Sequence, residues 1–191
     1  MKRKTFLNRA LQAGGGLVLL PSLSLLNGCE YAPTLRTNLT DTDMPLLDEI
    51  GEIIIPSSGG TQGAKAAGIG AYMMLMVHDC YTPKDREIFL NGLNTVDAIC
   101  AKQFKNSFVH LKADQKQEIL EQIQAEALAY KLDNSSKEQT LPQYFDMLKS
   151  LTISGYFSSE IGMTEARKYL PIPGRFESCI PYKKGDGAWA L

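Results

Sequence analysis

Few residues of this sequence are of types that could bind a metal or catalyse a reaction, and their spacing does not favour either role. The sequence contains two histidines, His78 and His110, and neither lies in an HExxH or comparable metal-binding spacing. His78, Asp79 and Cys80 are adjacent, but successive residues on a helix point in different directions and cannot chelate one ion together. We interpret His78 as a residue at a helix end and expect no metal site.

Two glycine-rich segments also fail to complete a nucleotide-binding motif. Residues 59–63 (Gly-Gly-Thr-Gln-Gly) lack the preceding strand and the Gly-Lys-Ser/Thr ending of a phosphate-binding loop. Residues 68–70 (Gly-Ile-Gly) lack the strand and the third glycine of a dinucleotide fingerprint. The sequence also has no CxxCH motif for haem and no GxSxG nucleophile elbow. We therefore expect a flexible interhelical loop at 59–63, no catalytic or cofactor-binding residue, and no catalysis by this chain itself.

Cys29 offers a different kind of chemistry. A basic start at residues 2–4 and an apolar stretch over 10–26 are typical of an export signal and not of a membrane span. Residues 26–29 (Leu-Asn-Gly-Cys) resemble the lipobox of bacterial lipoproteins, which implies cleavage after residue 28 and acylation of Cys29. Because Asn27 is unusual at its position, the alternative is an ordinary secretory signal followed by a chance cysteine.

The residues around this signal predict where the protein works. Residues 3–7 (Arg-Lys-Thr-Phe-Leu) resemble a twin-arginine signal, but Lys4 replaces the second arginine, which leaves the general secretory route open. Residues 29–40 are interpreted as a tether, and eleven extended residues reach about 36 Å. We expect a periplasmic protein that is tied by its lipid to a membrane. Glu30 favours the outer membrane under the sorting rule of enteric bacteria.

The remainder of the chain predicts one all-α domain over residues 41–191. The formal net charge is −1 and no basic stripe occurs, so we expect no nucleic-acid partner. In the segment 114–132 we expect Leu128 inside and Lys116 outside, and the segment 68–80 is apolar almost all round, which predicts burial. About five helices are predicted by apolar periodicity, at 43–55, 68–80, 82–104, 114–132 and 141–161, followed by a short helical turn at 164–167.

An extended tail rich in proline and glycine follows residue 162. It carries large apolar side chains that have to be buried somewhere, namely Phe176, Ile180, Tyr182 and Trp189. Either the tail wraps over its own helices, or part of it binds another protein, because tryptophan, tyrosine and arginine are frequent anchors of interfaces.

Spaced motifs along the whole domain resemble the gluconate 2-dehydrogenase subunit 3 family. In the first half they are Glu-Ile-Ile-Ile-Pro at 52–56, Gly-Ala-Lys-Ala-Ala-Gly at 63–68 and Asp-Cys-Tyr at 79–81. In the second half they lie at 151–162, 169–176, 179–182 and 185–190. The resemblance covers about residues 41–190.

The resemblance implies a non-catalytic small subunit of a membrane-associated dehydrogenase. It implies a large flavoprotein partner of the glucose-methanol-choline (GMC) oxidoreductase type, which holds FAD and oxidises gluconate, glucose or a glycoside. A cytochrome c subunit that often takes the electrons is a further expected partner. The small subunit supports folding, export and anchoring of the large one. The alternative is a free-standing periplasmic lipoprotein adaptor without a flavoprotein partner.

The remaining cysteines then predict a covalent link. If Cys29 is acylated, Cys80, Cys100 and Cys179 remain, which is an odd number in an oxidising compartment. A Cys80–Cys100 bond is not expected, because about 17 helical residues between them span about 25 Å. We predict a disulfide from Cys179 to the large subunit, at an interface that includes Phe176, Tyr182 and Trp189; an internal Cys80–Cys179 bond is the alternative.

Overall fold

The computed structural model describes residues 33, 35–134, 143–172, 174 and 179–190. The chain divides into two units, Met1–Ala32 and Pro33–Leu191, and only the second contains described residues. Its elements are η2 (Asp41–Asp43), α2 (Met44–Ile54), α3 (Ile69–Asp79), α4 (Pro83–Phe104), η3 (Phe108–His110), α5 (Ala113–Asn134), α6 (Tyr144–Ser158) and α7 (Glu160–Thr164). In this described part there are six α-helices and no strand, so the prediction of a helical fold is confirmed.

Helix ends follow local chemistry. Thr82 caps α4 by accepting a 3.2 Å hydrogen bond from the backbone N–H of Asp85, and Pro83 occupies the first helical position. Ser159 caps α7 in the same way, with a 3.1 Å bond from the N–H of Gly162. That cap starts the short helix earlier than expected, so the predicted turn at 164–167 is wrong and the helix ends at Thr164.

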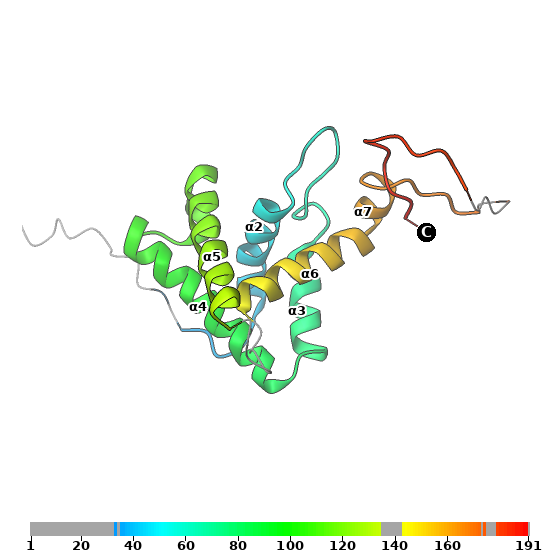
Figure 1. The fold of residues 1–191 in the computed structure, drawn as a ribbon. Helices are drawn as coiled ribbons and strands as arrows, with labels where there is room; N and C mark the ends of the chain where they lie inside the picture. Colours follow the sequence, from blue (N-terminus) through cyan, green and yellow to red (C-terminus); the bar gives the residue numbers. More distant parts are fainter. Residues whose placement is uncertain (1–32, 34, 135–142, 173, 175–178, 191) are drawn as a thin grey trace, which may run out of the picture. The chain divides into compact units, whose positions relative to one another are not determined.

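Helix α6 lies at the centre of the packing. It contacts α2, α3, α4 and α5, and Figure 1 shows it running across the other helices. Glycines allow two of these close approaches: a side chain at Gly92 of α4 would overlap the Tyr144 ring, and one at Gly155 of α6 would overlap Tyr72 of α3. The core is made of aliphatic and aromatic side chains from every long helix, among them Leu47, Ile50, Met73, Phe89, Leu93, Phe108, Ile119, Ile123 and Leu148.

Two side chains of α5 lie opposite to the prediction. Lys116 is buried, because its ammonium group reaches Glu49 of α2 at 2.6 Å, whereas Leu128 is 58 % exposed. A buried lysine needs an ionic partner, and Glu49 comes from a helix far away in the sequence. The apolar stripe of α5 is therefore shorter than its sequence pattern indicates.

Helix α3 also differs from the prediction of a buried helix. Ile69, Met73 and Val77 lie in the core, but Leu75 is 59 % exposed and Ala71 is exposed as well. The chain's own helices cover only one side of α3. An apolar helix face is therefore left uncovered within the described part of the chain.

Candidate functional site

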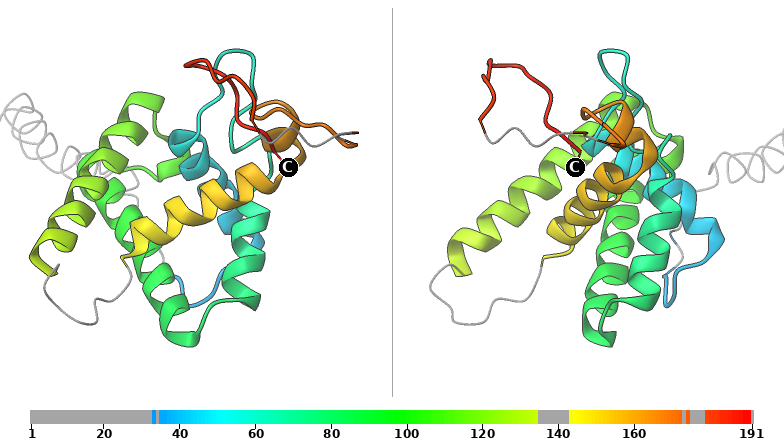
Figure 2. Two further views of the ribbon diagram at one scale, coloured as in Figure 1. Left: turned by 45° about the vertical axis from the view of Figure 1, so that its right-hand side comes forward. Right: turned by 90° about the vertical axis from the view of Figure 1, so that its right-hand side faces the viewer.

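The described part of the tail leaves α7 and closes back on its own base. The backbone N–H of Lys168 donates to the carbonyl of Ala188 at 2.8 Å, and the N–H of Ala190 donates to the carbonyl of Lys168 at 2.9 Å. The Lys168 ammonium also lies 5.8 Å from the centre of the Trp189 ring. Figures 1 and 2 show this segment beyond the α7 end of α6, apart from α4 and α5.

Large apolar side chains of this segment are exposed. Tyr182 is 77 % exposed, and the same set of exposed apolar residues includes Tyr169, Leu170, Ile172, Ile180 and Trp189. The sequence left two possibilities for the tail, burial against its own helices or contact with another protein. These residues are not buried against the chain's own helices. Trp189 is only half-exposed because Lys168 covers part of it.

The predicted site residues are only partly described. Cys29, the predicted lipidation site, and Phe176, one predicted interface residue, lie outside the described residues. Cys179, Tyr182 and Trp189 are described, and each is exposed in the C-terminal segment. The structure therefore shows three of the four predicted interface residues to be accessible.

The cysteines differ in their availability for pairing. Cys80 and Cys179 are exposed free thiols, and Cys100 is buried in α4. Burial, and the nearby charge of Asp97, raise the pKa of Cys100 to about 12, so this thiol has almost no thiolate at neutral pH. Cys80 follows α3, in the turn before α4, and Figures 1 and 2 place that turn and the tail at opposite ends of this unit.

The loop between α2 and α3 holds the base of the tail in place. Ser57 donates to the Glu52 carboxylate from its backbone N–H at 3.0 Å, which closes the loop on α2. Gln62 donates from its backbone and side-chain N–H groups to Glu165, at 3.1 and 3.0 Å. The Tyr156 hydroxyl donates to the Gln62 carbonyl at 2.7 Å. The glycine-rich loop therefore positions the end of α7, a role that its sequence alone does not reveal.

A buried ion cluster attaches the start of the described chain to α4. The Arg36 guanidinium pairs with Asp43 at 2.5 Å and with Asp97 of α4, and these two aspartates are 6 % and 3 % exposed. Burial alone would lower the pKa of Arg36, but the hydrogen bonds to Asp43 and Asp97 and the negative charges of these carboxylates together outweigh burial and raise it. The Arg36 N–H also donates to the Asn94 side chain at 2.8 Å. Residues from Arg36 onward, which the sequence assigns to the tether, thus contact the helical body.

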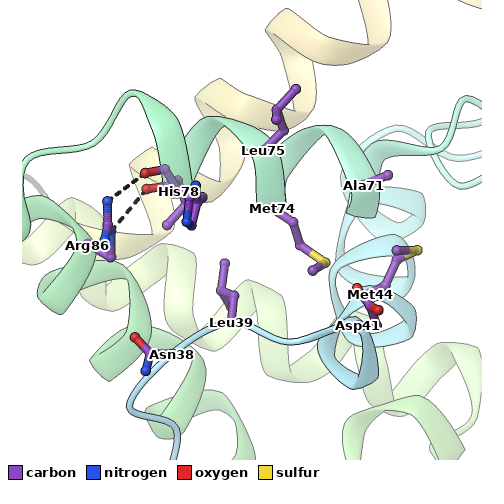
Figure 3. Close-up of a pocket in the computed structure, with 10 residues that line it drawn as sticks. Asn38, Leu39, Asp41, Met44, Ala71, Met74, Leu75, His78 and Arg86 are labelled. Atoms are coloured by element: carbon purple, nitrogen blue, oxygen red, sulfur yellow. Dashed lines mark hydrogen bonds between the residues drawn. The ribbon is translucent and has the colours of Figure 1, made fainter.

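A groove opens between this attached segment and α3 (Figure 3). It has a volume of about 600 Å³. We call it the α3 groove, and its apolar lining residues are Leu39, Met44, Ala71, Met74, Leu75 and Val77. Polar residues at its edge include Asp41 and His78, and Arg86 donates to the carbonyls of Val77 and His78 at 3.2 and 2.6 Å. The volume is in the range of ordinary binding sites.

The side chains of the two surfaces can be compared with the arrangement that a metal ion needs. Within the described ranges, no group of three or more His, Cys, Asp or Glu side chains is arranged to hold a metal ion. His78 Nδ1 lies 2.6 Å from the carboxylate of Asp79, its neighbour in the chain. What the two surfaces offer is apolar contact area, which is the chemistry of a binding site.

Comparison with known proteins identifies one family. The model of the family described as gluconate 2-dehydrogenase subunit 3 matches residues 41–174, from η2 to the first part of the tail. No curated protein and no solved structure matches the chain. None of the described helices is both long and apolar enough to span a bilayer.

Proposed function

The chain belongs to the gluconate 2-dehydrogenase subunit 3 family, and we propose that it is the non-catalytic small subunit of a periplasmic, membrane-anchored dehydrogenase. Membership itself makes it an accessory subunit of a dehydrogenase complex. The catalytic partner in this proposal is an FAD-dependent flavoprotein of the GMC type that oxidises gluconate, glucose or a glycoside. The observation that carries the proposal is the match over residues 41–174, which spans every described helix.

The exposed apolar side chains of the tail support the proposal that this chain has a stable protein partner. Apolar area in water costs roughly 25 cal/mol per Å², so the side chains around Tyr182 favour an occupant. Aromatic residues on an extended segment are typical anchors of a subunit interface. The tail is therefore proposed as a contact with the flavoprotein.

A disulfide from Cys179 to the flavoprotein is part of the same proposal. Cys179 is a free, exposed thiol in the tail. The turn that carries Cys80 lies at the other end of the unit, which favours the intersubunit bond over an internal Cys80–Cys179 bond. Such a bond would hold the tail at a high effective concentration near its partner.

Anchoring is proposed to occur through Cys29. The supporting observation is the lipobox-like sequence at 26–29, which follows the apolar stretch of the export signal. Three acyl chains would hold the complex at a membrane, because each buried methylene contributes roughly 0.8 kcal/mol. The twin-arginine-like start suits the export of a folded partner together with this chain, and we propose that route. A cytochrome c subunit is proposed as the electron acceptor on the family resemblance alone.

The function is tested with a GMC-type flavoprotein whose gene neighbours the gene of this chain. The flavoprotein is expressed once together with this chain and once without it. We expect the flavoprotein to be soluble, loaded with FAD and exported only in the presence of this chain. We also expect this chain to be prone to aggregation or poorly stable when it is expressed alone, and to form a one-to-one complex with bound flavin when it is co-expressed. A stable monomer with no such neighbour would instead identify a free-standing lipoprotein adaptor.

A further inference from the structure

The α3 groove is separate from the tail and is not used by the proposed function. One of its walls is α3, whose residues Ala71, Met74, Leu75 and His78 follow each other at helical spacing along one face. The other wall is the segment from Asn38 to Met44, which the Arg36 ion cluster attaches to the body. In Figure 3, Leu39 and Met74 extend into the space between the walls.

The groove has the composition of a surface made to be covered. Helix α3 is apolar on nearly all sides, yet Leu75 remains 59 % exposed. Two of the lining side chains are methionines, Met44 and Met74, whose flexible thioethers adapt to an apolar occupant. An amphipathic segment that binds in an apolar groove is a common mode of protein recognition.

The charges at the edge indicate the chemistry of the occupant. Asp41 lines the groove, is exposed, and has no ion pair with any residue in the described part of the chain. The Arg86 guanidinium donates to two backbone carbonyls at the end of α3 and is not directed to Asp41. An occupant with a lysine or arginine beside its apolar side chains would complement this carboxylate.

The range of the family match points to a partner common to the family. The match includes all of α3 and the wall from Asp41 to Met44, but it ends at residue 174, before Cys179, Tyr182 and Trp189. A contact that all members share is expected inside the matched range. Apart from Asn38 and Leu39, which precede the matched range, the α3 groove meets this condition, whereas the distal part of the tail does not.

We infer that the α3 groove binds an apolar segment of the flavoprotein subunit that carries a basic residue opposite Asp41. The inference rests on the proposed function, because it names the same partner. It adds a second contact, built from the helical body and independent of the tail. The complex would thus be held at two separate surfaces of this chain.

A matched pair of substitutions tests this inference. Leu75 and Leu128 are both leucines on helices, and they are 59 % and 58 % exposed. Full-length Leu75→Glu and Leu128→Glu are each co-expressed with the flavoprotein, purified through a tag on this chain, and diluted with a reducing agent present. The reducing agent prevents a Cys179 disulfide from hiding a weakened interface. Complex dissociation is then followed by size-exclusion chromatography.

We expect Leu75→Glu to weaken the complex at least about tenfold, as for an interface anchor, and Leu128→Glu to weaken it less than about threefold. Asp41→Lys should weaken it too, by a factor that shrinks as salt is added. Because all three side chains are exposed, the helical circular-dichroism signal and the melting temperature of each variant should match those of the wild type.

Other outcomes overturn the inference in distinguishable ways. Equal dissociation of the two glutamate variants would show that the groove is not an interface. The Leu75→Glu complex could instead stay intact, while Leu75→Glu in the Cys29→Ser background loses binding to vesicles of phosphatidylethanolamine and phosphatidylglycerol. That result would show that the groove binds lipid and not the flavoprotein. If wild-type chain forms no complex at all, the proposed function fails and this inference fails with it.

Discussion

Replacing Arg36 with methionine removes the cation that pairs with two buried carboxylates. Asp43 and Asp97 are 6 % and 3 % exposed, and the Arg36 side chain itself is only 17 % exposed. Because solvent screens this cluster little, the cost approaches that of breaking a buried pair, about 3–5 kcal/mol. The lower end is expected, since the segment around Arg36 lies at the edge of the body and can loosen. Even 3 kcal/mol is a large share of the roughly 5–15 kcal/mol that stabilises a typical domain.

Urea unfolding of the Cys29→Ser chain measures this loss through the helical circular-dichroism signal, at a protein concentration low enough to limit aggregation of the chain without its partner. Lys65→Met is the matched control, because Lys65 also pairs with a carboxylate, that of Glu49, but its side chain is 54 % exposed. The control should cost less than about 1 kcal/mol. Adding Asp43→Asn and Asp97→Asn to Arg36→Met should recover part of the loss, since no buried charge is then left unpaired. The reasoning is refuted if Arg36→Met destabilises no more than Lys65→Met.

Three further predictions concern the anchor, the disulfide and pH. Cys29→Ser should move the protein from the membrane to the soluble periplasmic fraction; a variant that stays membrane-bound without its partner would contradict lipidation. Non-reducing electrophoresis of the complex should show a band at the summed mass that disappears on reduction and in Cys179→Ser, whereas separate subunits would exclude the bond. Burial alone would raise the pKa of Glu49, but hydrogen bonds from Lys116 and Lys65 lower it below 4.5. The ionised Glu49 carboxylate therefore contributes its full stability above pH 4.5, and this contribution is lost as the pH falls further. Glu49→Gln should flatten the pH dependence of the unfolding free energy below pH 4.5. The same pH dependence in Glu49→Gln and wild type would count against this.

The local signals in the sequence predicted four helices closely, whereas the helix predicted at 141–161 is divided at Ser159 into α6 and α7. Thr82 and Pro83 define the start of α4 through chemistry that acts within one turn, and α4 ends at Phe104 as expected. Positions that depend on distant partners were predicted wrongly. Lys116 is buried because Glu49 of another helix pairs with it, and helical periodicity carries no information on that partner. The attachment of the glycine-rich loop to Glu165 likewise joins residues 103 positions apart.

The candidate site was predictable in its composition but not in its extent. The apolar residues of the tail were visible in the sequence, and the structure shows Tyr182 and Trp189 exposed. The α3 groove was missed, because an all-round apolar helix such as α3 reads as a buried one. Only the fold shows that Leu75 is left uncovered. An unusually apolar helix in an accessory subunit was the signal that could have found it.

The most direct test of the account is to purify a tagged form of this chain from its own cells and to record its composition and absorption spectrum. The account predicts a one-to-one complex with a flavoprotein, a flavin spectrum, and dehydrogenase activity with gluconate, glucose or a glycoside. Recovery of the chain alone, without flavin or dehydrogenase activity, would contradict its role as the accessory subunit of this enzyme.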